Sequence, residues 1–455
     1  MKSLISPKLA YLLLVLLALL FGLGQIQDIV QDRQQHRKRA VAGMGTPQIV
    51  TGPMVHLRCV ERWRDTTNLD AGHPQTVERE KDVSRLVPPE SLMARAGADV
   101  QNLHRSLHKV STYNMKLALH ARWTPESLKI RPQNERTRIS CATPELILPI
   151  SDPTGIRSAG LSWNGLALPL RAGTHHSRYN RGLHAVLPES VGQSPDDLEA
   201  VLDLELFGIE DWTFVPAGDM TQLSVQSNWQ HPSFGGQFLP AERAVGAEGF
   251  KANWRISSLA IGNGDDLQKG QPVCARVSEG DWEESKDCLK AIRVSFVDPV
   301  NAYTLSDRAS KYGLLFVVLT FVAVGLFEVM QRLRVHPVQY FLVGSAVAIF
   351  FLLLLSLGEH LAFNLAYAIA ATACVLLLTY YAVHILHGVR RGLPFGLGVG
   401  VLYGLLFLLL QLEQKALVVG SLALFAVLAA VMYLTRKVDW YRLLTPAGRA
   451  EAAQA

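Results

Sequence analysis

The chain has 455 residues and a formal net charge of +5; 49% of its residues are hydrophobic and 18% are charged. This composition is too apolar for an intrinsically disordered chain and is richer in apolar residues than a typical soluble enzyme. The apolar residues are concentrated near the two ends of the chain, with a long polar region between them. The composition therefore favours a membrane protein with a large water-exposed domain.

Six long apolar runs are present. The first is Leu9–Leu23, and the others are Tyr312–Met330, Val338–Leu357, Leu361–Leu386, Phe395–Leu412 and Ala416–Leu434. Each approaches the ~20 residues that a helix needs to cross ~30 Å of hydrocarbon. Since a single segment can satisfy its backbone there only as a helix, the runs predict six transmembrane helices. The first run lacks a good small-x-small cleavage pattern after it, so we expect an uncleaved anchor.

The basic residues indicate how these helices are oriented. Lys and Arg are most frequent in the segments on the same side as the N-terminus, which predicts cytoplasmic N- and C-termini and places residues 28–311 outside the cytoplasm. The outer segment has 33 Lys and Arg against 34 Asp and Glu, whereas the rest of the chain has 11 against five. The positive charge is thus a topology signal, which makes the lipid bilayer the expected partner and does not favour nucleic acid.

The outer segment has the pattern of a β-rich domain. After a helical continuation to about residue 42, short apolar-alternating runs are separated by Gly, Pro, Asn and Asp, which predicts twisted sheets packed on each other. The runs are Ile49–Cys59, Asn114–Trp123, Leu161–Leu170, Val201–Leu206, Met220–Trp229, Phe250–Ile256 and Ala291–Val297. The predicted fold class is an α+β membrane protein with six transmembrane helices and a large β-rich domain between helices 1 and 2.

This fold implies four parts of the chain. They are residues 1–27 (cytoplasmic N-terminus and first helix), 28–311 (outer domain), 312–435 (five-helix bundle) and 436–455 (cytoplasmic tail). Four of the five cysteines, Cys59, Cys141, Cys274 and Cys288, lie in the outer domain, where disulfides can form. Four cysteines allow three pairings, and we hypothesise a Cys274–Cys288 bond around a Gly- and acid-rich stretch. The fifth cysteine, Cys374, is expected to pack inside a membrane helix.

A search for catalytic patterns favours a protein that is not an enzyme. The stretch Gly160–Asn164 lacks the final glycine of a nucleophile elbow, and Ser106 and Lys109 match Ser-x-x-Lys without the motifs that usually accompany it. On a helix, His104 and His108 would share a face and could bind a metal, but no third ligand is near in sequence, so a solvated face is favoured. We expect no cofactor and no metal.

Two longer blocks resemble the CreD family of bacterial inner-membrane proteins. The first contains Ser227-Asn228-Trp229-Gln230-His231-Pro232-Ser233-Phe234, Gly236, Phe238-Leu239-Pro240, Arg243, Gly249-Phe250 and Trp254. The second contains Leu305-Ser306-Asp307-Arg308-Ala309-Ser310-Lys311-Tyr312, Phe327-Glu328, His336-Pro337-Val338-Gln339-Tyr340 and Glu359-His360. The resemblance covers essentially the whole chain and is strongest over residues 220–371. It offers no counterpart for the four outer cysteines.

The resemblance implies an inner-membrane protein of Gram-negative bacteria, multi-pass, with its large domain in the periplasm. It implies membership of the Cre two-component stress response, and links to cell-envelope integrity and colicin tolerance, with no established catalytic activity. A non-catalytic envelope protein that binds an envelope component or a protein partner is therefore the leading expectation. The alternative is a membrane enzyme or transporter that acts on a lipid or cell-wall intermediate.

The two blocks supply the candidate site residues. The first is a loop that either faces a partner or forms a structural corner of the sheets, with the structural role favoured: Trp229, His231, Pro232, Phe234, Gly236, Phe238 and Pro240. The second is a junction between the outer domain and the bundle: Asp307, Arg308, Lys311, Glu328, His336 and Pro337. Asp307 is expected to cap the second membrane helix, Glu328 to pair with Arg332, and Pro337 to occupy the first turn of the third helix.

Overall fold

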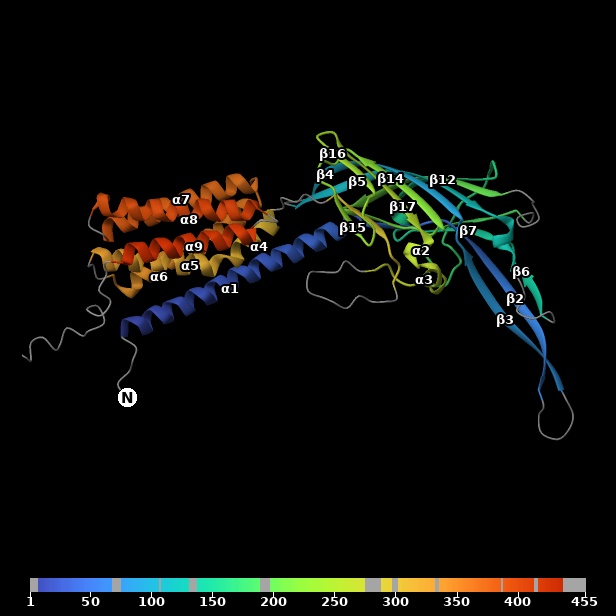
Figure 1. Ribbon diagram of the computed structural model, residues 1–455, viewed down its shortest axis with the longest axis horizontal. Helices are drawn as coiled ribbons and strands as arrows, with labels where there is room; N and C mark the ends of the chain where they lie inside the picture. Colours follow the sequence, from blue (N-terminus) through green and yellow to red (C-terminus); the bar gives the residue numbers. More distant parts are fainter. Residues whose placement is uncertain are drawn as a thin grey trace, which may run out of the picture. The chain divides into compact units, whose positions relative to one another are not determined.

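A computed structural model describes residues 7–67, 75–105, 108–130, 137–188, 197–274, 288–296, 302–331, 335–385, 388–412 and 416–436. The chain divides into two compact units, which Figure 1 shows as a helical part and a part built of strands. The helical unit comprises Met1–Arg39 and Val300–Ala455, and the sheet unit comprises Ala40–Pro299. The mixed helix and sheet class with a large sheet domain is thus confirmed.

The helical unit contains the apolar helices. They are α1 (Pro7–Ala42), α5 (Gly313–Gln331), α6 (Pro337–Gly358), α7 (Phe363–Ile385), α8 (Val389–Gln411) and α9 (Ala416–Thr435), and the short α4 (Ala302–Lys311) precedes α5. Within the described residues, four helical stretches are long and apolar enough to cross a membrane: Tyr11–Val41, Pro337–Gly358, Phe363–Ile385 and Gly392–Gln411. The apolar stretches of α5 and α9, Gly313–Glu328 and Val418–Tyr433, are shorter.

Aromatic side chains fill the interior of the helical unit. The rings of Phe316, Phe350 and Tyr403 pack edge to face with centroids 4.7–5.7 Å apart. Tyr367 Oη donates a hydrogen bond to the carbonyl oxygen of Tyr403 (2.7 Å), and Cys374 Sγ lies 3.1 Å from Tyr403 Oη. Cys374 is buried among these rings, which is the packing role expected for it.

The N-terminal helix continues past the length needed for one membrane crossing. It has 36 residues, against the ~20 needed to span the hydrocarbon. Near its far end, Val30 packs against Leu355 of α6, and Arg33 forms an ion pair of 3.7 Å with Glu359, the residue that ends α6. Polar pairing and apolar packing therefore join α1 to α6 over this continuation.

The described strands of the sheet unit form three sheets. A four-stranded sheet has the order β1 (Gln48–Thr51), β13 (Asp211–Val215), β18 (Ile292–Ser295), β15 (Ser233–Gly236). A six-stranded sheet has the order β10 (Arg171–Ala172), β11 (Gly182–Val186), β7 (Glu145–Pro149), β2 (Met54–Thr67), β3 (Gln75–Val87), with β6 (Arg138–Cys141) also paired to β2. The far part of the β2–β3 hairpin extends beyond the other strands (Figure 1).

The third sheet is the largest. Its order is β16 (Glu242–Gly246), β17 (Gly249–Ser257), β14 (Met220–Ser227), β4 (Ser91–Arg105), β5 (His108–Trp123), β12 (Leu198–Ile209), β8 (Ile156–Trp163), β9 (Leu166–Ala167). Short helices connect some strands: η1 (Pro125–Leu128), η2 (Pro153–Gly155), α2 (Ser258–Ile261) and α3 (Gly264–Lys269). Each of the seven stretches predicted as strands contains at least one strand. Nine described strands lie outside these stretches: β3, β4, β6, β7, β10, β11, β13, β15 and β16.

The three sheets share one apolar core. Residues of the eight-stranded sheet alternate along each strand, so that Leu92, Ala94 and Ala96 of β4 are buried while the residues between them are exposed. This period of two gives one buried and one solvent-facing side, as expected of a largely antiparallel sheet. The buried side meets the four-stranded sheet, where Phe234 packs against Phe250. The sheet packing that the sequence predicted is therefore present in this unit.

Two disulfides connect the four cysteines of the sheet unit. Cys274 bonds to Cys288 across 14 positions, which is the pair that the sequence favoured, and Cys59 bonds to Cys141 across 82 positions. Cys59 and Cys141 face each other in the register of β2 and β6. The second bond therefore holds β6 against β2 at the start of the extended part of the β2–β3 hairpin.

Candidate functional site

The predicted aromatic loop forms a corner between two sheets. Phe234, on β15, packs edge to face against Phe250 and Trp254 of the eight-stranded sheet, with ring centroids 5.4 and 5.7 Å away. Trp254 Nε1 donates to the carbonyl oxygen of Phe238 (3.1 Å), and Trp229 Nε1 donates to that of His231 (2.9 Å). These contacts favour the structural interpretation of the loop.

Backbone geometry in this corner agrees with a structural role. Gly236 has φ +85°, and a Cβ at this position would overlap the carbonyl oxygen of Ala291. The two prolines, Pro232 and Pro240, are half-buried, whereas His231 is exposed. The rigid turn therefore serves to bring β15 beside β18.

The junction residues do not gather into one site. Asp307, Arg308 and Lys311 lie inside α4, and α5 begins only at Gly313. The expectation that Asp307 caps the second membrane helix is therefore wrong. The polar residues before the apolar run form an amphipathic helix of their own, and Asp307 lies within it. Lys311 is exposed and Arg308 half-buried.

At the other end of α5, hydrogen bonds surround Glu328. It accepts one from Tyr340 Oη (2.8 Å) and one from the backbone N–H of Val335 (3.3 Å); its predicted partner, Arg332, lies outside the described residues. His336 caps α6 through Nδ1, and Pro337 lies in the first turn, as expected.

The proposed helical face of His104 and His108 does not exist. His104 is on β4 and His108 on β5, in register with Lys109 and Arg105 respectively. In the part of the chain that is described, no three His, Cys, Asp or Glu residues are arranged to hold a metal ion.

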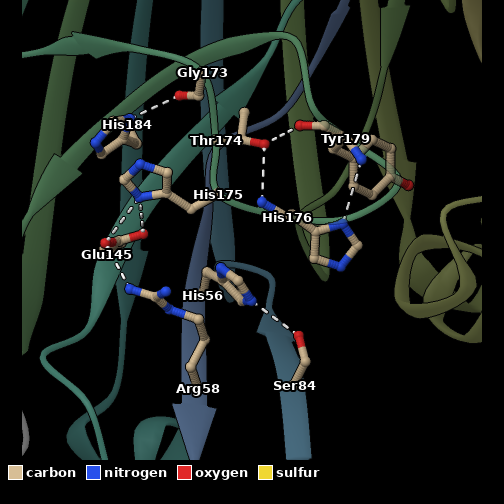
Figure 2. A network of polar contacts seen from close by, with 10 residues as sticks. All are labelled: His56, Arg58, Ser84, Glu145, Gly173, Thr174, His175, His176, Tyr179 and His184. Carbon is tan, nitrogen blue, oxygen red and sulfur yellow. Dashed lines mark hydrogen bonds and ion pairs between the residues drawn. The ribbon is translucent and has the colours of Figure 1, made fainter.

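A different group of histidines lies on the six-stranded sheet (Figure 2). His175 Nδ1 lies 3.2 Å from both carboxylate oxygens of Glu145, and Arg58 donates to the same carboxylate at 2.9 Å. The ring of His184 lies 4.1 Å from that of His175, and its Nδ1 donates to the carbonyl oxygen of Gly173 (2.8 Å). Since the Glu145 side chain is only 6% exposed, the Arg58 guanidinium and the contact with His175 compensate for its burial.

The rest of the cluster consists of His56 and His176. Both are buried, at 2% and 7% exposure, with ring centroids 5.2 Å apart. His56 Nε2 is hydrogen-bonded to Ser84 Oγ (2.9 Å), while its Nδ1 is buried without a partner among the residues described. Burial and then the neighbouring His176 lower the pKa of His56 to about 4, and burial and then Arg178 lower the pKa of His176.

These pKa shifts predict a pH-dependent stability of the sheet unit. Because folding favours neutral His56, the unfolded chain binds a proton more readily between pH 6.5 and 4. The contribution of neutral His56 to the free energy of unfolding should thus be fully present above about pH 6.5. The free energy of unfolding should fall by roughly 2–3 kcal/mol as the pH decreases to 4. Denaturant unfolding of the full chain in detergent, followed by tryptophan fluorescence, measures this.

The matched variants identify the source of the pH effect. His56→Gln keeps a hydrogen-bonding atom for Ser84 and should flatten the pH profile, whereas His231→Gln, at an exposed position, should leave it as in the wild type. An equal slope in His56→Gln and the wild type would contradict the assignment.

A trough crosses the solvent-facing side of the eight-stranded sheet. Its volume is about 750 Å³. Its lining includes two adjacent rows of residues that are in register across the strands: Lys251, Gln226, Gly97, Lys116, Glu205 and Ser158, then Ser224, Arg95, Ala118 and Asp203. Small residues such as Gly97 and Ala118 lie between charged ones, which makes the trough. A second hollow of about 280 Å³ adjoins it, sharing Arg95 and Ser224.

The charges of the trough are separated by strand. Three cations (Lys251, Arg95 and Lys116) lie on β17, β4 and β5, and two carboxylates (Asp203 and Glu205) lie on β12. Arg95 and Asp203 flank Ala118 in one row, two strands apart, which corresponds to ~10 Å. No hydrogen bond or ion pair joins these five side chains to another residue in the described ranges. The trough therefore presents charged groups of both signs that form no ion pair within the described residues, although Lys116 and Glu205 are opposite each other in register.

Sequence reasoning missed both sites. His56, Glu145 and His184 come from three strands that are distant in sequence, and only the pairing of β2, β7 and β11 brings them together. The alternation Met93-x-Arg95-x-Gly97 is a weak sequence signal for the trough. The residues of adjacent strands that complete the trough are set by the strand order, which the sequence does not show.

These features define a multi-span membrane protein with a large sheet domain. A sequence model of the family described as inner membrane protein CreD matches residues 4–441. The chain is also similar to the inner membrane protein CreD of Escherichia coli (strain K12), with 30% identity over 454 residues, 98% of this chain and 96% of that protein. The chain therefore belongs to the CreD family, and the resemblance seen in the sequence is confirmed.

Proposed function

We propose that this CreD-family protein is a non-catalytic envelope-integrity protein of the inner membrane, which binds an extended segment of a periplasmic or inner-membrane protein in the trough of its sheet domain. In this proposal six helices cross the membrane, both termini are cytoplasmic, and the sheet unit lies in the periplasm. The disulfides Cys59–Cys141 and Cys274–Cys288 support an oxidising compartment for that unit.

One observation carries the binding role: five charged side chains without partners in the described structure surround a trough large enough for a ligand. Charges of both signs, about 10 Å apart, complement a ligand that also has both signs at that spacing. An extended peptide fits, because three residues span ~10 Å. The lining residues include no aromatic ring for stacking a sugar.

The alternative, a membrane enzyme or transporter, would need a substrate cavity within the bundle. The described bundle cavity measures about 30 Å³ and is lined mostly by apolar residues, with Gln339 and Tyr381 among them. This is room for about one water molecule. The trough therefore offers the better support for a binding protein.

The test uses a capped, fluorescent four-residue peptide with glutamate and lysine at its ends and alanines between. The full chain in nanodiscs should bind it with an affinity that falls as salt is raised, because exposed charges are screened. Combining Arg95→Gln, Lys116→Gln and Asp203→Asn should weaken binding at least tenfold. Fluorescence anisotropy gives the affinity.

Two comparisons make the result decisive. Lys129→Gln, an exposed cation outside the trough, should leave binding unchanged, and peptides with only one charge should bind more weakly than the one with both. Equal binding of all peptides, or loss of affinity in Lys129→Gln as large as in the trough variant, would exclude the proposal. Competition by lipid vesicles but not by peptide would favour the alternative.

A further inference from the structure

One loop beside the histidine cluster depends on an uncharged imidazole. The loop, residues 173–181, joins β10 to β11, and we call it the latch loop. His176 Nδ1 accepts hydrogen bonds from the backbone N–H groups of Arg178 and Tyr179, each at 3.3 Å. Figure 2 shows the bond from Tyr179. A nitrogen that accepts hydrogen bonds carries no proton, so the loop in this conformation requires neutral His176 with its proton on Nε2.

The latch loop is held closed by further contacts. Thr174, fully buried, accepts from the backbone N–H of His176 (3.3 Å) and donates through Oγ1 to the carbonyl oxygen of Tyr179. The Tyr179 side chain packs on an apolar group that includes Met54, Leu86 and Leu267. The Arg178 side chain lies against Gly270, where α3 ends. The closed loop is therefore held by a small network of contacts, and the two hydrogen bonds that His176 Nδ1 accepts are one part of it.

A positive charge on His176 would be poorly compensated. The titratable and charged groups of the elements packed around it and its neighbour His56 are His56 and Arg58 on β2, Glu145 on β7, Asp266 on α3, and His175, Arg178 and Tyr179 of the loop itself. Glu145 already binds Arg58 and His175, while Arg178 and His56 disfavour a further cation. Among the described groups, the buried carboxylate Glu145 is thus already shared, and Asp266, beside Tyr179, is only half-buried.

We propose that the latch loop is a pH-operated device that opens when a solvent proton binds Nδ1 of His176. The proton turns an acceptor into a donor, so that the two backbone N–H groups of Arg178 and Tyr179 lose their partner at once. The loop then leaves its site and exposes the imidazolium to water. The start of the loop stays attached, because His184 Nδ1 already donates to Gly173 and an extra proton would go to its Nε2.

Hydrogen exchange of the full chain in nanodiscs tests the proposal. Peptides covering residues 174–181 are compared at pH 7.5 and pH 5, after correction for the intrinsic pH dependence of exchange. Wild-type protection of the latch loop should fall about tenfold or more. In His176→Asn the side-chain oxygen replaces Nδ1 as a hydrogen-bond acceptor but does not titrate. Protection of the latch loop in this variant should therefore be equal at pH 7.5 and pH 5.

His231→Asn, at an exposed histidine, serves as the control and should respond to pH as the wild type does. Strand β14 serves as an internal reference in the His56→Gln background, where the effect of His56 on global stability is removed, and its protection should stay constant there. A latch loop with equal protection at both pH values in the wild type overturns the proposal, and so does an unchanged pH response in His176→Asn. Loss of protection shared by β14 in the His56→Gln background overturns it even if His176→Asn does not fold.

Discussion

Gly236→Ala is expected to destabilise the sheet unit by about 3 kcal/mol. The residue has φ +85°, a conformation that costs an alanine energy, and the added Cβ would overlap the carbonyl oxygen of Ala291. Relief of this overlap would require β15 to separate from β18, which removes Phe234 from its contacts with Phe250 and Trp254. Denaturant unfolding in detergent, monitored by tryptophan fluorescence, measures the loss.

The neighbouring glycine is the matched control. Gly235 is on the same strand, yet a Cβ there would meet no atom within 4 Å, and its φ lies outside the left-handed region. Gly235→Ala should therefore change stability by less than about 1 kcal/mol. Similar losses for the two variants would mean that the corner tolerates a shift of β15 and that its backbone is not rigidly required.

Removal of the Cys59–Cys141 disulfide should lower the free energy of unfolding even more than Gly236→Ala does. The bond joins residues 82 positions apart, and the loop-entropy relation gives about 4.5 kcal/mol for a loop of that length. Cys59→Ala with Cys141→Ala should lower the unfolding free energy by that order. It should also loosen the extended part of the β2–β3 hairpin, since β6 pairs with β2 beside it.

The second disulfide provides the comparison. For the Cys274–Cys288 bond, with 14 positions, the same relation predicts about 3 kcal/mol, so the paired variants should differ by about 1.5 kcal/mol. Proteolysis under native conditions should cut the β2–β3 hairpin faster only in the Cys59/Cys141 variant. An order of stability reversed between the two variants would show that strand pairing, rather than loop length, determines the contribution.

Hydropathy predicted most of the helical unit. Runs such as Val338–Leu357 correspond to α6 within a residue or two, because burial in hydrocarbon depends on composition more than on partners. The failure at Asp307 has a physical cause. An amphipathic helix such as α4 alternates apolar and polar residues every turn, so a search for continuous apolar runs passes over it.

Strands were predicted where apolar and polar residues alternate strictly, as in β12 and β14. The strand β3 was missed because both of its faces are largely exposed and it has no apolar side. The strand β13 was missed for the opposite reason: Trp212, Thr213 and Phe214 are buried without alternation. Strand order follows from long-range pairing, and single-sequence patterns contain little of it.

The candidate sites were less predictable than the fold. His175 and His176 are adjacent in a polar stretch of the sequence, and their partners His56 and Glu145 lie far from them with no local motif. A buried carboxylate such as Glu145 appears in sequence as an ordinary strand residue, and only its neighbours explain it. The aromatic corner, by contrast, was visible because prolines, glycines and aromatic residues cluster within a dozen positions.

The central place of β18 has a consequence for how the nascent chain matures. This strand, at residues 292–295, lies between β13 and β15, which are made about 60 to 80 residues earlier. Until it arrives, β13 is paired only with β1 and β15 has no partner strand in this sheet, and Trp212 and Phe214 lack part of their cover. An incomplete chain therefore presents an open apolar sheet edge, a substrate for chaperones and proteases. Synthesis of the segment just before α4 completes the domain, so its folding is timed to the synthesis of α4 and α5.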